Sequence, residues 1–362
     1  MSVIGDFLYL FQSNSYQQNH LQKYTNCIIK DCVLYALELS GYMCTLEVIC
    51  DYQKTRKRYT EMLKAKFGIE IEFTGITRTK AAEIMANHFD STFTSDGGFY
   101  DKKVVLDDLG RKWTVMYDGS IKPLKKVDGV KIHASDLYKC ELVTPVLTYR
   151  EDIETLQELI RKLRKGGAFV DEGSCGIHIH LNGADHTPRS IRNFINIIAS
   201  KNDLLYKSLQ IDEARTKWCK KMDKQLVETM NKKKPATFSQ IENIWYAGFC
   251  ESRNTHYHKS RYHFLNLHSF FHGNHTVELR GFNSTLHAGK IRSYIVLSLA
   301  LNHQALTQQK ASTKKNQTEN EKFAMRTYLN RIGLVGDEFK NCREHLCKHL
   351  NGSAAWRNGT VA

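Results

Sequence analysis

The chain has 362 residues, of which 41% are hydrophobic and 25% charged, and its formal net charge at pH 7 is +14. This composition is typical of a globular protein with one large core or two smaller ones. The ten cysteines include no CxxC pair, so the sequence indicates reduced cytosolic thiols rather than a disulfide framework or a zinc knuckle. Neither a signal peptide nor an apolar run long enough to cross a bilayer is present, so we expect a cytoplasmic protein without a membrane partner.

Basic residues gather in four short runs, at 161–165, 220–224, 232–234 and 310–315. A basic surface attracts nucleic acids, nucleotides and acidic polymers alike. No aromatic RNA-binding signature, finger spacing or helix-turn-helix accompanies these runs, so specific nucleic-acid recognition is not supported. Solvated helix ends and loops account for most of them, and the net charge leaves nucleic acid as an unfavoured partner. The oligomeric state is not indicated.

The predicted elements alternate between helices and short strands. A helical pattern covers 27–52, and amphipathic helices are predicted over 80–89, 152–165, 188–209 and 291–306. Strands are predicted over 67–73, 113–117, 138–145, 175–182, 261–270 and 276–283. The result is an α+β chain whose candidate site residues all lie on strands or at strand ends.

The stretch 67–73 (FGIEIEF) is predicted to be a strand with two carboxylates on one face. Because side chains alternate along a strand, Glu70 and Glu72 share the side opposite the apolar residues. On a face open to solvent such a pair has no special meaning. On an enclosed face, like-charged carboxylates must take up a proton or a cation.

Two later strands repeat this arrangement. In 175–182 (CGIHIHLN), His178 and His180 share a face, and in 276–283 (VELRGFN after Thr276), Glu278 and Arg280 do. A single histidine or glutamate in a strand is usually structural, but three coincident pairs are poorly explained by solvated sheet edges. They favour a curved sheet whose concave polar face holds cations.

Six motifs, taken together, resemble the amidoligase family of the glutamine-synthetase-like carboxylate-amine ligases. In chain order they are GIEIEF, WTVMYDGSI, CELVTPVL, CGIHIHLN, YHFLNLHS and VELRGFNST, and they extend over about residues 65–306. Each motif alone is weak, whereas the ordered combination is specific. The resemblance implies a glutamine-synthetase-like fold, in which a curved antiparallel sheet flanked by helices forms a trough for two divalent ions and ATP.

The resemblance also implies a role for each matching residue. The implied metal ligands are Glu70, Glu72, Glu141, His178 and Glu278, with Glu70 and Glu72 split between the two ions. The implied catalytic residues are Arg280, beside the transferring phosphate, and His180, in contact with substrate or nucleotide phosphate. Asp118 and Ser120 are expected to line the ATP site together with Arg280. The flap carboxylate and the ammonium-binding acid of glutamine synthetase have no counterpart, so ammonia as the amine is not supported.

The chain is accordingly divided into three segments. Residues 1–61 are interpreted as a non-catalytic helical extension, 62–309 as the amidoligase-like catalytic domain, and 310–362 as a basic helical C-terminal segment. The expected reaction is ATP-dependent formation of an amide bond through an acyl phosphate, on an amino acid, peptide or wall-precursor carboxylate with a small-molecule or peptide amine. Mg²⁺ is the expected ion, although the imidazole ligand also suits Mn²⁺.

Two other functions fit parts of the pattern. A metal-dependent hydrolase could use the same ligands without ATP, and a basic nucleic-acid-associated protein could retain a vestigial trough. Arg280 beside Glu278 favours the ligase. A group of six histidines between 256 and 275 invites a second metal site, but without matching cysteines or an HExxH helix most of them are expected to be loop, strand and pocket residues. Cys175 is interpreted as a buried, inert thiol rather than a nucleophile.

Overall fold

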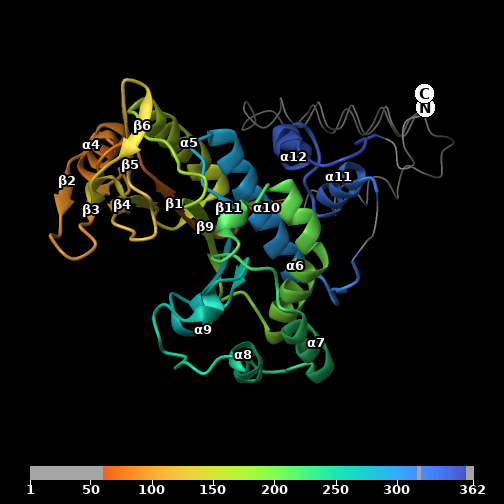
Figure 1. Ribbon diagram of the computed structural model, residues 1–362. Helices are drawn as coiled ribbons and strands as arrows, with labels where there is room; N and C mark the ends of the chain where they lie inside the picture. Colours follow the sequence, from red (N-terminus) through yellow and green to blue (C-terminus); the bar gives the residue numbers. More distant parts are fainter. Residues whose placement is uncertain (1–59, 316–318, 356–362) are drawn as a thin grey trace, which may run out of the picture. The chain divides into compact units, whose positions relative to one another are not determined.

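A nine-stranded sheet organises the part of the chain that the computed structural model describes, residues 60–315 and 319–355 (Figure 1). The strand order is β10-β11-β9-β1-β7-β4-β3-β2, β8 also pairs with β1, and every pairing is antiparallel. The strands are β1 (Lys66–Phe73), β2 (Phe93–Ser95), β3 (Lys103–Leu106), β4 (Lys112–Met116), β7 (Cys140–Val143), β8 (Leu147–Thr148), β9 (Gly176–Asn182), β10 (Leu265–Asn266) and β11 (Thr276–Asn283). The predicted helix over 27–52 lies outside the described residues.

The strand β1 has a neighbour on both sides, and its apolar face lies in the core. Phe67, Ile69, Ile71 and Phe73 alternate along it and are at most 1% exposed. The inward residues of β9 are equally buried, as the alternation in the sequence predicts. The apolar side chains of both strands therefore leave the glutamates and histidines together on the opposite face.

Helices pack against the strands of the sheet and against one another. They are α4 (Arg78–His88), α5 (Tyr149–Lys165), α6 (Pro188–Ser208), α7 (Lys224–Lys233), α8 (Phe238–Tyr246), α9 (His268–His272), α10 (Ala288–Thr307), α11 (Glu321–Arg331) and α12 (Lys340–Cys347), with short 3₁₀ turns η1 (Asp136–Tyr138), η2 (Glu213–Arg215), η3 (Lys259–Arg261) and η4 (Asp337–Phe339). Helix α10 packs against α5, α6, α12 and β9, whereas α4 packs against β3, β4 and α5 (Figure 1). Among the described helices, none combines the length and the apolar content needed to cross a bilayer.

The local sequence explains where the long helices begin and end. Thr187 and Ser190 form a capping box at the start of α6, with Pro188 in the first turn. Helix α5 buries the apolar stripe that its spacing predicts, and it ends at Gly166. The next residue, Gly167, has a φ of +102°, a conformation that side chains other than glycine rarely adopt.

The prediction of one strand over 261–270 is wrong. The 3₁₀ turn η3 ends at Arg261, β10 has only two residues, and α9 begins at His268. The amide of Phe264 donates to the carbonyl of Lys220, outside the sheet, whereas its carbonyl accepts from the amide of Arg280 on β11, so the chain before β10 divides its backbone hydrogen bonds between two partners. The alternating apolar residues in this segment are buried in the core, but they belong to a turn, a two-residue strand and a helix.

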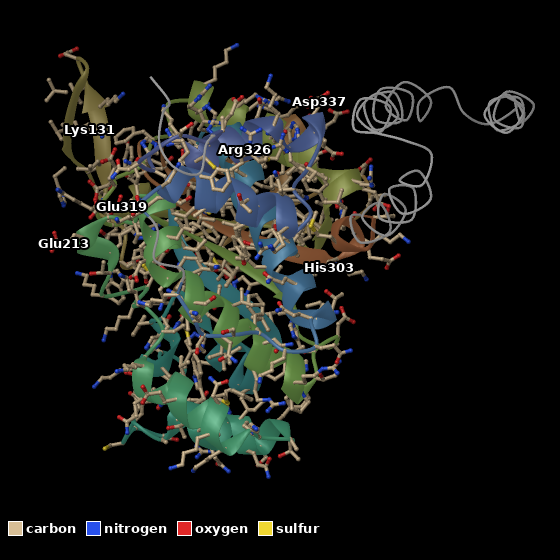
Figure 2. The ribbon with its side chains drawn as sticks, turned by 90° about the vertical axis from the view of Figure 1, so that its right-hand side faces the viewer. Lys131, Glu213, His303, Glu319, Arg326 and Asp337 are labelled. Atoms are coloured by element: carbon tan, nitrogen blue, oxygen red, sulfur yellow. The ribbon has the colours of Figure 1, made fainter. Side chains whose placement is uncertain are left out.

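Some described elements carry no strong sequence signal. The hairpin of β5 (Leu124–Val127) and β6 (Val130–His133) is a separate two-stranded sheet, and β6 is exposed throughout. Figure 2 labels Lys131 on this hairpin. Strands β2 and β3 and helices α7 and α8 also went without prediction, because they are short or only half-buried.

The α+β class is confirmed by the mixture of helices and antiparallel sheet. Whether the polar face forms a glutamine-synthetase-like trough stays a prediction, as does the division at residues 61 and 309. The described part of the C-terminal segment contains α11 and α12. Their buried residues Met325, Leu329 and Leu346 belong to the same apolar core as the strands.

A candidate metal centre on four neighbouring strands

The register of β11, β9, β1 and β7 aligns the predicted site residues in a row. Glu70 lies opposite His178 on β9, and Glu72 lies opposite Glu141 on β7. His180 lies opposite Glu278 on β11. Directly opposed residues of antiparallel strands project from the same face, so four strands contribute to one polar surface.

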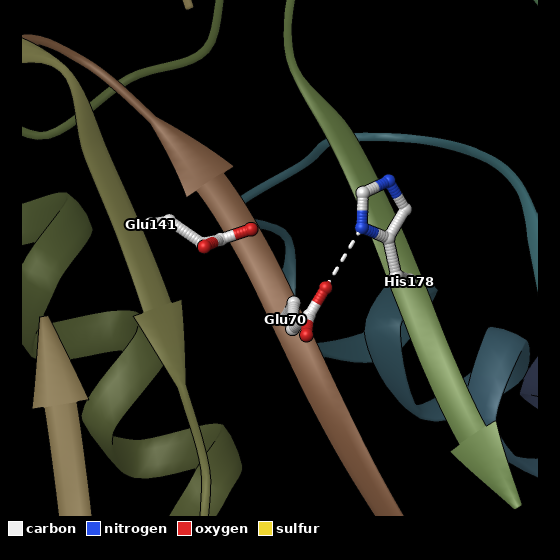
Figure 3. A group of neighbouring side chains, drawn as sticks. All are labelled: Glu70, Glu141 and His178. Carbon is white, nitrogen blue, oxygen red and sulfur yellow. Dashed lines mark hydrogen bonds and ion pairs between the residues drawn. The ribbon is translucent and has the colours of Figure 1, made fainter. Parts of the chain in front are cut away.

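Glu70, Glu141 and His178 form the first candidate metal-binding group. Each offers a ligand atom, and these atoms lie within 4.8 Å of one another. Figure 3 shows Glu70 on the central strand between the other two side chains. His178 Nδ1 lies 2.9 Å from Glu70 Oε2, and both His178 and Glu141 are buried.

Glu72, Asp118 and Glu141 form a second group with the same spacing. Asp118 lies in the loop that follows β4. Glu141 belongs to both groups, whereas Glu70 and Glu72 fall in different ones, and the split of these two glutamates between two ions stays a prediction. The amide of Gly176 donates to Glu72 Oε2 at 2.6 Å and orients that carboxylate.

Burial and close charged neighbours shift the pKa values of the carboxylates at this centre. Burial and then the neighbouring charges of Glu70, Glu72 and Asp118 raise the pKa of Glu141 well above its usual range. Burial, followed by the charge of Asp118, raises the pKa of Glu72 to about 7. The pKa of Glu70 is held well below its usual range, because the charge of His180 and hydrogen bonds from both histidines outweigh burial.

The donor set suits a divalent cation. Four carboxylates and one imidazole make up the two groups, and oxygen-rich sets of this kind hold Mg²⁺ or Mn²⁺. Burial, and after it the neighbouring carboxylates, raise the pKa of Glu72 and of Glu141, so their ionised forms need a compensating positive charge. A cation would supply that neutralisation in place of protons.

His180 lies beside this centre but belongs to neither group of described ligands. Its Nε2 is 3.1 Å from Glu70 Oε1, and its Nδ1 is 3.0 Å from the hydroxyl of Thr276. Thr276 is in turn 2.8 Å from Ser269. Although burial opposes protonation, the charges of Glu70 and Glu278 raise the pKa of His180 to about 9. The imidazole therefore lies between Glu70 and Thr276, at the edge of the first candidate group.

Glu278 and Arg280 form a buried ion pair. Arg280 Nη1 donates to Glu278 Oε1 at 2.5 Å, and Asn266 Nδ2 donates to Glu278 Oε2 at 2.7 Å. Although burial opposes ionisation, the charges of Arg280 and then of the two histidines lower the pKa of Glu278 to about 2. Arg280 Nε is buried without a hydrogen-bond partner. Among the described residues, Glu278 belongs to neither candidate metal group, so its role as a ligand stays a prediction.

Ser120 contacts Asp118, a candidate ligand of the second group. Its amide donates to Asp118 Oδ1 at 2.6 Å, and its hydroxyl donates to the same oxygen. Ser120 itself is exposed. It therefore orients a candidate ligand, while the predicted contact of both residues with ATP stays a prediction.

Three contacts at the site escaped the sequence analysis. Asn266, which holds Glu278, lies inside the YHFLNLHS motif, and Thr276 shares a strand face with Glu278, so alternation would have found it. Arg215 on η2 has no such signal. Its guanidinium donates to the carbonyls of Cys175 and Phe282, where it lies against Gly176.

The predicted histidine group does not gather metal ligands in the described residues. His258, His268 and His272 instead stack ring on ring, and the hydroxyl of Tyr246 lies 2.6 Å from His268 Nδ1. Cys175 is buried, and burial, then the charge of Glu72, raises the pKa of its thiol to about 12. The structure thus gives it the surroundings of an inert thiol.

Fold and site together define an α+β protein with a candidate divalent-metal centre on the polar face of an antiparallel sheet. Residues 63–302 match the family model described as "putative amidoligase enzyme", and the chain belongs to this family. The matched region contains every residue of the centre, from Glu70 to Arg280. Membership places the chain among enzymes, and among ligases in particular. Among curated proteins, no sequence matches the chain.

Proposed function

We propose that the protein is an ATP-dependent ligase that joins a carboxylate to an amine through an acyl phosphate. The observation that carries the proposal is the arrangement of two candidate metal groups that share Glu141, beside the buried guanidinium of Arg280. Amide formation in water is uphill, so the carboxylate must first be activated. Phosphorylation by ATP provides that activation, and the amine then displaces phosphate from the acyl phosphate.

Mg²⁺ or Mn²⁺ bound in the two groups would neutralise phosphate charge. Glu70, Glu141 and His178 would hold one ion, and Glu72, Asp118 and Glu141 the other, by the spacing of their ligand atoms. Phosphoryl transfer requires alignment and charge stabilisation more than covalent help from the protein. The residues of the centre are of the types that supply both.

Arg280 would bind the transferring phosphoryl group. Its Nη1 donates to Glu278, which is itself held by Asn266. Its Nε has no hydrogen-bond partner and remains available as a donor to an anion. A guanidinium that contacts the phosphoryl oxygens stabilises the charge that shifts during transfer. His180, whose Nδ1 lies 3.0 Å from the hydroxyl of Thr276, would contact the substrate carboxylate or a nucleotide phosphate.

The substrates in this proposal are an amino acid, a peptide or a wall-precursor carboxylate together with a small-molecule or peptide amine. We place the reaction in the cytoplasm, where ATP is abundant and thiols stay reduced. Among the described cysteines, all are free. A basic surface also attracts ATP and other anionic substrates, which accounts for the net charge of +14 without a nucleic-acid partner.

The test traps the acyl phosphate with hydroxylamine. The full chain is incubated with ATP, Mg²⁺ or Mn²⁺, hydroxylamine and a panel of amino-acid and peptide carboxylates, and hydroxamate and ADP are measured. We expect both products only when ATP, metal and one class of carboxylate are present together. Turnover of a peptide with metal but without ATP would overturn the proposal in favour of a hydrolase.

Arg280→Lys provides the matched variant. Lysine keeps the charge and the pair with Glu278 but loses the planar fork, so we expect nearly normal ATP and metal binding with hydroxamate formation slowed about 10²- to 10³-fold. A thermal melt of the variant tests whether Arg280 has only a structural role. If the guanidinium only neutralises Glu278, the variant should lose stability in proportion to activity.

A further inference from the structure

Cationic and aromatic side chains alternate from the metal centre to the surface. The guanidinium carbon of Arg280 lies 6.0 Å from the ring centroid of Tyr262, and that of Arg261 lies 6.0 Å from the same ring. Arg261 also lies 5.3 Å from the ring centroid of Tyr257, whose hydroxyl is 3.0 Å from that of Tyr100. We call these five residues the arginine–tyrosine column.

The backbone ties the column to the site strand. Arg261 ends η3, and the chain then runs through Tyr262 to Phe264, whose carbonyl accepts from the amide of Arg280 at 2.8 Å. The outer end lies near the second metal group, because the amide of Tyr117, the residue before Asp118, donates to the carbonyl of Tyr100 at 2.8 Å. The column therefore follows the centre from Arg280 outward on the side of Asp118.

Arg261 has unused hydrogen-bonding capacity. Its Nε is buried without a hydrogen-bond partner, as is that of Arg280, which is only 6% exposed. Its Nη1 makes one long contact, 3.4 Å to the carbonyl of His256. In the described part of the chain, no carboxylate forms an ion pair with Arg261. A guanidinium that stacks on two rings is pre-oriented, so it loses little freedom when it binds an anion.

We propose that Arg261 is a second phosphate-binding residue, which holds the non-transferred phosphates of a nucleoside triphosphate while Arg280 holds the transferring one. The inference rests on the proposed function and adds to it the residue that recognises the polyphosphate chain. Two guanidiniums that flank one ring offer separate forks to successive phosphates. The ligand chemistry is that of a polyphosphate, and its source is either a nucleotide or an inorganic chain.

The experiment compares Arg261→Met with Arg253→Met in the full chain. Arg253 is the matched control, because it belongs to the same segment and lies 5.3 Å over the ring of Tyr246, but it pairs with Glu242 and Asn243. Calorimetric titrations with Mg²⁺-ATP and with Mg²⁺-tripolyphosphate measure the two affinities. We expect Arg261→Met to weaken both by about tenfold or more, the cost of one charge-assisted contact, and Arg253→Met to weaken neither.

The possible results separate the inference from the proposed function. Equal ATP affinity in Arg261→Met and the parent would overturn the inference and leave the ligase proposal standing. If the parent binds tripolyphosphate through Arg261 but does not bind ATP, the polyphosphate subsite stands and the ligase proposal fails. If Arg261→Met weakens the binding of ATP but not of tripolyphosphate, the inference is supported and the phosphates that Arg261 holds belong to a nucleotide. Arg261→Lys keeps the charge but loses the planar fork, so it should lose less affinity than Arg261→Met. It tests the same contact if the methionine variant proves to have a lower melting temperature.

Discussion

Glu141 is the side chain on which both candidate metal groups depend. Its carboxylate lies within ligand spacing of Glu70 and His178 on one side and of Glu72 and Asp118 on the other. Without a cation, burial and then three neighbouring carboxylates make its ionisation costly. Its loss should therefore remove stabilisation by metal while leaving the metal-free protein as stable as before.

We expect Glu141→Gln to abolish stabilisation by metal without destabilising the metal-free protein. Glutamine resembles the protonated acid that the raised pKa of Glu141 favours, whereas it removes the shared charged ligand from both groups. Thermal melts with Mn²⁺ and with a chelator measure the two effects. Glu172→Gln, an exposed position, is the control. A melting temperature that still rises with Mn²⁺ in Glu141→Gln would refute the shared-ligand assignment.

The stability of the metal-free protein should fall as pH rises from about 4.5 to about 7. In this window the folded protein binds more protons than the unfolded chain, because the pKa of Glu72 is raised from 4.5 to about 7, and Glu141 acts in the same direction. Glu278 acts only at lower pH, where its stabilisation is lost as pH falls from 4.5 to about 2.

Urea unfolding across this window, with a chelator or with Mg²⁺, gives the measurement. Excess Mg²⁺ should reverse the trend, because ligands lose their protons when the ion binds and its affinity rises with pH. Glu72→Gln should flatten the metal-free profile. A metal-free stability that rises steadily between these pH values would show that the carboxylates are not crowded as the structure places them.

At the scale of the element, a bulge in β11 directs Arg280 into the site. The pairing with β9 shifts register between Leu279 and Phe282, and Gly281 lies in this irregular stretch. A Cβ at Gly281 would lie 1.9 Å from Cδ2 of Phe264. Only glycine allows the ring to pack so closely against the strand, so the position of Arg280 depends on a packing contact outside the centre.

We expect Gly281→Ala to destabilise the protein by about 1–3 kcal/mol, the usual cost of overpacking a core. Phe264→Leu makes room, so the double variant should lose less than the sum of the two single losses. Urea unfolding of all four proteins completes a double-mutant cycle. Strict additivity would show that the ring does not constrain the bulge.

At the scale of the molecule, the C-terminal helices complete the core that supports the site. Helix α12 packs against α10, which in turn packs against β9. The side chains of Met325, Phe339 and Leu346 are at most 1% exposed. The basic residues lie on separate elements, as Lys131 on the hairpin and Arg326 on α11 illustrate (Figure 2), which fits a generally basic surface better than one nucleic-acid groove.

Three truncations test this organisation. A chain that ends at Lys310 should aggregate or melt at a much lower temperature, because it exposes the apolar face of α10. A chain that begins at Tyr59 should retain metal binding and its melting temperature, whereas a start at Met62 cuts into a helical turn whose Met62 and Leu63 are 1% exposed. Circular dichroism melts compare the three proteins with the full chain. Loss of metal binding in the chain from Tyr59 would show that residues 1–58 support the core.

The sequence by itself determined the residues of the polar face and most of the long elements. Alternation is local, so Glu70 with Glu72 and His178 with His180 follow from neighbouring residues alone, and so does the apolar stripe of α5. The same local reasoning failed over 261–270, where Phe264 is buried by contacts from several elements and not by one strand.

Only the tertiary structure decided which of these groups meet. Strand register brings Glu141 to Glu72, and a loop brings Asp118 to both, although no spacing in the sequence relates them. Arg215 under Gly176 and Arg261 between two tyrosine rings are likewise products of long-range packing. Alternation specifies which face a side chain occupies, whereas the burial and pairing of strands distant in the chain determine which charges it faces.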